Sequence, residues 1–353
     1  MRITALAGGI GGARFLRGVL AAQPEAEVTV IGNTGDDIWV HGLRVCPDLD
    51  TVMYTLGGGI SAERGWGREA ETFTVKDELA AYGVEPTWFG LGDKDIATHL
   101  VRTQSMQAGF SLSDITAALC ERWQPGVRLI PMTDDRAETN VIVDDPSGAL
   151  DSSGRPMQIA IHFQEWWIKH RAQIPARGFV LVGVDEARPA PGVIEAIEQA
   201  DIVLLPPSNP VVSIGTILQI AGIADALRAT SAPVVGLSPI IGGAPVRGMA
   251  DACLTAIGLE TTALAVAAHY GRRLASNAMH GNALDSGGID RAATAAISGG
   301  IIDGWLVDES DAESVPAIEA LGIRCRAVPL LMTDLDATKA MAIEALSLAA
   351  LPQ

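Results

Sequence analysis

The sequence predicts an α/β protein with a Rossmann-like, doubly wound and mostly parallel sheet that carries an inserted α+β subdomain. Near the N-terminus, an apolar segment at 3–7 is followed by a glycine-rich turn, a helical pattern and a second apolar segment at 27–33. This order is a βαβ unit, which implies parallel strands. The apolar segment 201–205 lacks alternation, as expected for a parallel strand covered on both faces. Similar segments lie at 233–237, 301–307 and 323–328.

The middle of the chain has a different pattern. Apolar residues at helical spacing predict a first helix at 13–20, and further helices are predicted near 94–107 and 113–123. A strand at 127–130 and alternating segments follow, the latter at 140–143 and 157–163. We therefore assign residues 1–90 and 171–353 to the Rossmann-like core and residues 91–170 to an inserted α+β subdomain.

Composition excludes several classes of protein. The 353 residues include 25 Lys plus Arg against 42 Asp plus Glu, a net charge of −17, which disfavours binding to nucleic acid or to anionic membranes. The four cysteines are far apart, so neither a disulfide framework nor a cysteine zinc site is predicted. Prolines and glycines interrupt the long uncharged runs, and no signal peptide or transmembrane segment is predicted. We expect a cytoplasmic protein.

The glycine loop at 8–12 is the first candidate binding element. A glycine turn between a strand and a helix lets the backbone approach a phosphate at the helix N-terminus. Gly9 and Gly11 fit only part of the dinucleotide fingerprint, because the third glycine falls at Arg14 and Asn33 stands where an acid is expected. The loop therefore predicts phosphate contact without indicating NAD, and a plain tight turn is the alternative.

A cluster of four carboxylates follows the second predicted strand, namely Asp36, Asp37, Asp48 and Asp50. Open α/β sheets bind ligands at the carboxyl ends of their strands. Hard oxygen ligands suit Mg²⁺, which takes one or two carboxylates together with substrate phosphates and water. The alternative is that some of these residues cap helices or turns, and we expect this for at least two of the four.

A third group combines acidic and basic residues near a predicted loop–helix junction: Asp93, Lys94, Asp95, His99 and Arg102. Either Asp93 or Asp95 could serve only as an N-cap of the helix, whereas capping does not explain Lys94.

Two further loops follow buried strands. Ser208, Asn209 and Ser213 offer neutral hydrogen-bonding groups for phosphate, ribose or a base, and the segment 238–243 has the same position after the next strand. Several such loops at one edge of a sheet predict a binding crevice.

Taken together, these motifs resemble the 2-phospho-L-lactate transferase family of coenzyme F420 biosynthesis. The match runs in order from the first strand to about residue 270. The segments that carry it are 6–14 (LAGGIGGAR), 33–37 (NTGDD), 47–54 (PDLDTVMY), 91–99 (LGDKDIATH), 131–135 (PMTDD), 163–165 (FQE), 207–210 (PSNP) and 238–241 (SPII). Lys94 is an accepted variant of a position that is Arg or Lys in the family, and Ile10 replaces a frequent Thr.

The resemblance implies a Mg²⁺-dependent transferase, usually a dimer. It would move a phosphoenolpyruvyl or 2-phospho-L-lactyl group from its GDP-activated form to the deazaflavin Fo and release GMP. The residues implied to bind the nucleotide are Gly9, Gly11, Gly12, Ser208, Asn209 and Ser213. Those implied to bind Fo are Asp50, Lys94, Thr34 and His99, with the inserted subdomain contributing to this acceptor site. Asp37 and Asp50 are assigned to catalysis and to the metal.

Two other functions are weighed against this one. A non-catalytic regulator of the same superfamily that binds a sugar nucleotide would keep the glycine loop but would not need the PDLD and GDKD motifs. An NAD-linked dehydrogenase is weakened by the missing third glycine and acid. For the donor, an Ala- and Arg-rich sequence similar to actinobacterial members favours the phosphoenolpyruvyl form.

Overall fold

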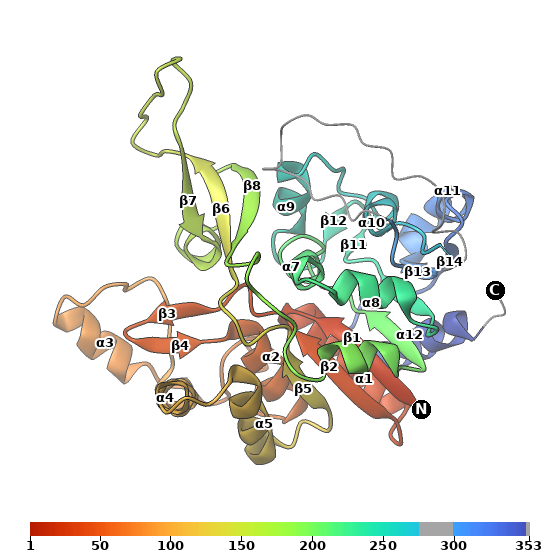
Figure 1. The fold of residues 1–353 in the computed structure, drawn as a ribbon, viewed down its shortest axis with the longest axis horizontal. Helices are drawn as coiled ribbons and strands as arrows, with labels where there is room; N and C mark the ends of the chain where they lie inside the picture. The colour runs from red at the N-terminus through yellow and green to blue at the C-terminus, as the bar shows by residue number, and fades with distance from the viewer. Residues whose placement is uncertain (275–298, 351–353) are drawn as a thin grey trace.

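The computed structural model describes residues 1–274 and 299–350, and it contains a seven-stranded parallel sheet (Figure 1). The strands are β1 (Arg2–Ala7), β2 (Glu27–Gly32), β5 (Arg128–Pro131), β9 (Ile202–Leu205), β10 (Val234–Leu237), β13 (Gly304–Val307) and β14 (Arg324–Ala327). Their order is β14-β13-β10-β9-β1-β2-β5. Each strand lies inside a segment predicted from the sequence or extends at most one residue beyond it, so the Rossmann-like α/β class is confirmed.

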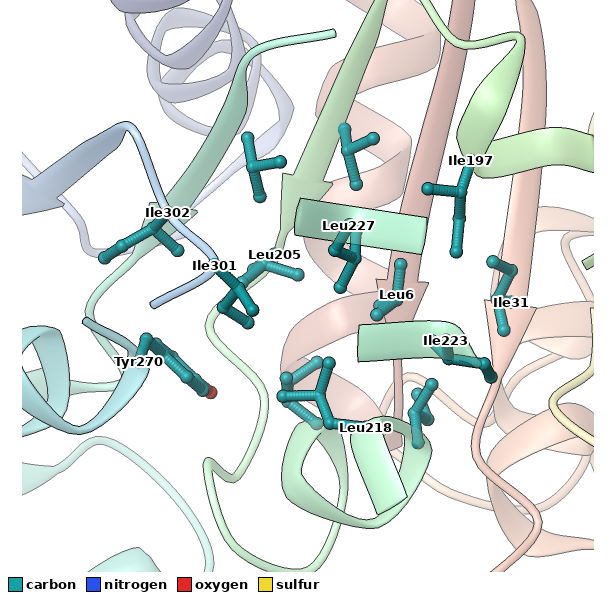
Figure 2. Packing of buried hydrophobic residues seen from close by; sticks show 14 of the residues in the cluster. Leu6, Ile31, Ile197, Leu205, Leu218, Ile223, Leu227, Tyr270, Ile301 and Ile302 are labelled. Carbon is teal, nitrogen blue, oxygen red and sulfur yellow. The ribbon is translucent and has the colours of Figure 1, made fainter. Parts of the chain in front are cut away.

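Helices cover both faces of this sheet. One face carries α1 (Gly9–Ala22), α2 (Pro47–Leu56), α5 (Leu112–Trp123) and α12 (Leu335–Ala349). The other carries α6 (Val193–Glu198), α7 (Ile214–Gln219), α8 (Ile223–Ala229), α9 (Ala250–Ala256), α10 (Ala263–Tyr270) and α11 (Val315–Ala320). Alternate strand residues supply the two cores: Ala5 faces the first layer of helices, and Leu6 faces the second. Figure 2 shows the second core, where Leu6 and Leu205 lie near Leu227.

A separate antiparallel sheet stands beside the core in Figure 1. It consists of β6 (Glu138–Asp144), β7 (Gln158–His162) and β8 (Ala176–Val182), in the order β7-β6-β8. The predicted alternating segments are confirmed as β6 and β7, and their inner side chains pack around the buried Trp166.

The predicted range 91–170 does not coincide with this separate unit. Its strand β5 pairs with β2 in the core sheet, while β8 lies beyond residue 170 and pairs with β6. The helices α4 (Asp93–Gln107) and α5 belong to the long crossover that returns the chain to the sheet, as a parallel strand pair requires.

Smaller elements complete the described residues. A hairpin of β3 (Ile38–Val40) and β4 (Leu43–Val45) follows β2, α3 (Thr74–Ala81) precedes α4, and β11 (Ile240–Ile241) pairs with β12 (Ala244–Pro245). Two further helical turns lie at Glu165–Lys169 and Glu309–Ser314. Within the described parts of the chain, every helix is too short or too polar to cross a membrane.

The chain changes direction across the sheet between β1 and β9. From β1 it proceeds to β2 and β5 on one side, and later occupies the other side with β9, β10, β13 and β14. The loops after β1 and β9 therefore leave neighbouring strands at a topological switch point, where open α/β sheets form their ligand crevice.

Glycines allow the two loops at this point to touch. The Ser208 hydroxyl donates to the Gly8 carbonyl at 2.8 Å, and the Gly8 N–H donates to Ser208 Oγ at 3.3 Å. A Cβ on Gly11 would stand 2.6 Å from the Pro207 carbonyl oxygen. Helix α1 begins at Gly9 rather than at the predicted residue 13, so these glycines form its first turn.

We expect Gly11→Ala to destabilise the protein. Alanine favours a helix over glycine by about 1 kcal/mol, but forced overpacking costs about 1–3 kcal/mol, so the clash with Pro207 outweighs the propensity gain. Urea unfolding measures the difference. Gly90→Ala is the matched control, because the nearest atom to its Cβ belongs to Trp66 at 3.7 Å. A Gly11→Ala protein as stable as wild type would contradict this reading of the switch point.

Candidate active site

Asn33 organises the acidic loop beside the glycine turn. Its side-chain amide donates to Asp48 Oδ2 at 2.9 Å and to Asp36 Oδ1 at 3.3 Å, while its own Oδ1 accepts from the Gly35 N–H at 2.9 Å. Asp48, in the first turn of α2, also accepts from the Gly9 N–H at 2.8 Å. The glycine loop and the acidic loop are thus joined through one carboxylate.

Asp36 and Asp48 are buried carboxylates that interact with each other. Burial raises the pKa of Asp48 to about 6, although hydrogen bonds from Asn33 and Gly9 act in the opposite direction. Burial and the charge of Asp48 raise the pKa of Asp36 well above its ordinary value. In the described part of the chain, only neutral groups, the Asn33 amide and the Gly9 N–H, donate to these two carboxylates, so they compensate only part of the charge.

The loop after β9 closes the other side of the crevice. Ser208 and Ser213 are buried, and a Cβ on Gly12 would lie 2.7 Å from Ser208 Oγ. Asn209 Oδ1 accepts from the N–H groups of Val211 and Val212 at 2.9 and 3.2 Å, which fixes its own loop. The structure therefore places the serines that we assigned to the nucleotide against the glycine turn.

Arg44 holds the second half of the acidic loop. Its guanidinium lies 3.0 Å from Asp37 and 3.5 Å from Glu138, and all three side chains are largely buried. Burial raises the pKa of Asp37 to about 6, an increase that the charge of Arg44 opposes. His162 Nε2 lies 3.1 Å from the Asp37 carbonyl, so β7 of the antiparallel sheet also contacts this loop.

Arg102 on α4 forms a buried ion pair with Asp50 on α2. Burial by itself would lower the pKa of Arg102, but the charge of Asp50 and its other neighbours raise it above its ordinary value. Helix α2 begins at Pro47 and its cap position is Cys46, so Asp50 lies inside the first turn rather than at the cap.

His99 extends this ion pair into a chain of polar side chains. Its Nδ1 lies 3.1 Å from Arg102 Nη1, a donor, so Nδ1 accepts and Nε2 carries the proton. That Nε2 lies 3.5 Å from Asp95, which accepts a 2.7 Å hydrogen bond from the Tyr54 hydroxyl. His99 is fully buried, so it could contribute to Fo binding only indirectly, through the residues that enclose it.

Lys94 lies at the exposed start of α4. Its Nζ donates to the Glu69 carbonyl at 3.0 Å, and the Glu71 carboxylate accepts from the N–H groups of Lys94 and Asp95 at 2.7 and 3.2 Å. Asp93 instead accepts from the first N–H groups of the neighbouring helix α3 at 2.9 and 3.1 Å. Of the two acids expected as possible caps of α4, Asp93 caps α3 and Asp95 faces His99.

The carboxylates of Asp37 and Asp50 fit a magnesium ion. Each uses one oxygen for an arginine, and Asp37 Oδ1 and Asp50 Oδ2 are buried without a hydrogen-bond partner among the described residues. In the same part of the chain, no three His, Cys, Asp or Glu side chains form a metal cage. Two free carboxylate oxygens completed by substrate phosphates and water are the set that Mg²⁺ usually accepts.

Sequence reasoning assigned no role to several residues of this site. Arg44 could have been found, because it is the one Arg or Lys between Asp37 and Asp48 in a segment whose acids need a countercharge. Glu138 and His162 carry no such local signal. Thr34, assigned to Fo, is buried in the acidic loop, and its hydroxyl has no hydrogen-bond partner among the described residues.

The fold and the site together define a Rossmann-like α/β protein with a candidate active site at the switch point of its sheet. The family model described as 2-phospho-L-lactate transferase CofD matches residues 3–320. The chain belongs to this family of transferases.

Relatives and a solved structure extend this result. A phosphoenolpyruvate transferase of Streptomyces coelicolor is 60% identical over 349 residues, covering 99% of this chain and 98% of the relative. Those of Thermobifida fusca and Mycolicibacterium smegmatis are 58% and 53% identical, again over 99% of this chain. A solved structure from Bacillus halodurans aligns with a TM-score of 0.57 at 15% identity, covering 98% of this chain and 99% of that chain, and supports the fold alone.

We expect Asp48→Asn to remove a pH-dependent cost of folding. The carboxyl ionises near 3.8 in the unfolded chain and at about 6 in the folded protein, so its ionisation disfavours the folded state increasingly as pH rises between these values. At about 1.4 kcal/mol per pKa unit, the unfolding free energy of the variant should gain up to about 3 kcal/mol relative to wild type from pH ~4 to ~7.

Urea unfolding across this pH range measures the difference. The control is Asp225→Asn, because the Asp225 side chain is 81% exposed and its removal should give no comparable trend. If the difference in unfolding free energy between Asp48→Asn and wild type stays constant with pH, burial does not raise the pKa of the Asp48 carboxyl.

Proposed function

We propose that this enzyme transfers the phosphoenolpyruvyl group from its GDP-activated form to the deazaflavin Fo, releasing GMP and forming the dehydro precursor of coenzyme F420. The observation that carries the proposal is the 60% identity with a phosphoenolpyruvate transferase over nearly the full length of both chains. The 2-phospho-L-lactyl donor is the alternative substrate. The family resemblance further supports a homodimer that acts in the cytoplasm.

The crevice between β1 and β9 suits the guanosine diphosphate part of the donor. Gly9, Gly11 and Gly12 form the first turn of a 14-residue helix, whose N-terminus favours a phosphate. Ser213 borders this turn with a hydroxyl group that can donate to a phosphate or ribose oxygen, whereas Ser208 donates its proton to the Gly8 carbonyl and supports the turn itself.

The group around Asp50 suits the acceptor. The Arg102 guanidinium engages one Asp50 oxygen and leaves the other without a partner. Lys94 lies at the exposed end of the same helix as Arg102, where it can reach a polar edge of Fo. His99 supports Asp50 through Arg102.

The reaction forms one P–O bond and breaks another. A ribityl hydroxyl of Fo attacks the phosphorus that bears the enolpyruvyl group, and the bond to the bridging oxygen breaks, so GMP leaves with the electron pair. The free Asp50 oxygen orients the hydroxyl and takes its proton. Positioning and electrostatic stabilisation supply most of the catalysis, and no covalent enzyme intermediate is needed.

A magnesium ion would be held by Asp37 and Asp50. When bound, it neutralises the charge that develops on the phosphate oxygens. Arg44 and Arg102 orient these two carboxylates without occupying both oxygens of either.

Incubation of the purified protein with Fo, Mg²⁺ and each activated donor tests the proposal by mass analysis of the product. We expect the dehydro product to form faster than the lactyl product. Faster turnover with the lactyl donor would reverse the donor assignment. Thermal stabilisation by a UDP-sugar or NAD but not by GDP would overturn the transferase function, because a ligand stabilises the folded state that binds it.

Asp50→Asn should lower the single-turnover rate by at least about 100-fold, a barrier increase of about 2.7 kcal/mol, while GDP affinity is kept. Asparagine keeps an acceptor for Arg102 but cannot take a proton. Because the buried Arg102 loses its countercharge, the variant should also be less stable, by up to about 3–5 kcal/mol, and the assay must use the folded fraction.

Asp95→Asn is the matched control for this variant. It changes the far end of the same polar chain and leaves the Asp50 carboxylate in place, so we expect a much smaller loss of rate. If Asp50→Asn stays within about threefold of wild type, under ~0.7 kcal/mol of barrier, the catalytic assignment of Asp50 is wrong.

A further inference from the structure

A second cavity lies on the opposite side of the glycine loop from the β9 crevice. It has a volume of about 230 Å³ and is lined by Ile10, Arg14 and Arg17 of α1 together with residues of α2, the 60–65 loop and the start of α12. Positions 10, 14 and 17 share one face of α1, because residues four and three apart are neighbours on a helix surface. Gly11 instead faces the loop after β9.

Three guanidinium groups gather at this cavity. Arg247 Nη1 lies 2.9 Å from where a Cβ of Gly65 would stand, and Gly65 is part of the cavity wall. Burial and the charges of Arg247 and Arg17 lower the pKa of Arg14, which places the three cations close enough to repel one another.

The three arginines lack carboxylate partners within the described residues. None of them has a hydrogen bond or an ion pair there, in a chain whose net charge is −17. The carboxylate that lines the cavity, Asp334, accepts from the Ala337 N–H at 2.8 Å and from the Thr333 hydroxyl at 3.2 Å, and so caps α12. Asp334 thus forms no ion pair with the arginines, and clustered arginines that are not paired with a carboxylate suit an anion.

The size of the cavity suits a small anion. A volume of about 230 Å³ is large enough for a phosphorylated three-carbon acid. Since Ile10 belongs to the glycine loop, the cavity begins where the phosphates of the donor would end. The hydroxyl groups of Thr55 and Ser61 lie in the same wall and add hydrogen-bond donors.

We propose that Arg14, Arg17 and Arg247 form a subsite for the phosphorylated three-carbon acid of the donor and pair with its carboxylate. The inference rests on the proposed function, because it places the transferred group on the α1 face opposite the nucleotide crevice. A planar guanidinium matches a carboxylate through two parallel hydrogen bonds.

Titration of the full-length protein with phosphoenolpyruvate alone, and separately with GDP alone, tests this subsite. We expect saturable binding of phosphoenolpyruvate to wild type. The Arg14→Gln/Arg247→Gln double variant should lose at least about tenfold in that affinity, since one hydrogen bond to a charged group contributes about tenfold or more. Its GDP affinity should stay within about threefold. Arg155→Gln is the matched control, because the Arg155 side chain is 80% exposed on the β6–β7 connection, away from the cavity.

The outcomes separate this inference from the proposed function. Unchanged phosphoenolpyruvate affinity in the double variant, or no saturable binding to wild type, overturns the subsite. Equal losses for GDP and phosphoenolpyruvate also overturn it, since the arginines would then hold the nucleotide. Binding that depends on Arg14 and Arg247 without any transfer to Fo would refute the proposed function and leave the acid subsite standing.

Discussion

The contact between the glycine loop and the loop after β9 is the constraint on which the rest of the site depends. Because Gly8 and Gly11 have no side chains, Ser208 and the Pro207 carbonyl can lie against the first turn of α1. That turn presents the Gly9 N–H to Asp48, which fixes the start of α2 and with it the position of Asp50. The Asp50–Arg102 pair then joins α4 to the same set of contacts, so one chain of contacts positions both the proposed nucleotide side and the proposed acceptor side.

The buried ion pairs of this site are better explained by the orientation they give to the carboxylates than by a contribution to the stability of the fold. Taking a carboxylate and a guanidinium out of water costs several kcal/mol per ion, and their attraction repays little more than this. Asp37 and Asp50 are each held at one oxygen by an arginine, while the other oxygen has no hydrogen-bond partner among the described residues. Preorganised charges of this kind need no rearrangement when a charged ligand arrives, which is how electrostatic catalysis lowers a barrier.

The local parts of this structure could be predicted from the sequence, and the long-range parts could not. Apolar runs located the central strands because a parallel strand covered on both faces must be apolar. The edge strand β14 contains two arginines and no buried residue, and the strand at 127–130 was assigned to the inserted subdomain although β5 pairs with β2 in the core. The β3–β4 hairpin was missed because its two-residue turn uses His41 at φ +51°, a conformation more typical of asparagine or glycine. The pairing of Arg102 with Asp50 joins residues 52 positions apart, and no periodicity reports it. For the same reason the motifs could propose candidate residues such as Asp50, while the contacts of these residues came only from the fold.

The distribution of charge is compatible with the anionic donor that we propose for this acidic protein. A net charge of −17 repels anions at long range, but at physiological ionic strength charges separated by more than about 8 Å are largely screened. Within that distance the charges of Arg14, Arg17 and Arg247 add to one another, because none of the three is paired with a carboxylate among the described residues. A carboxylate or phosphate bound there would pair with this positive charge. The proposed subsite would therefore favour a ligand that carries an acid in addition to its nucleotide over one that fills the nucleotide crevice alone.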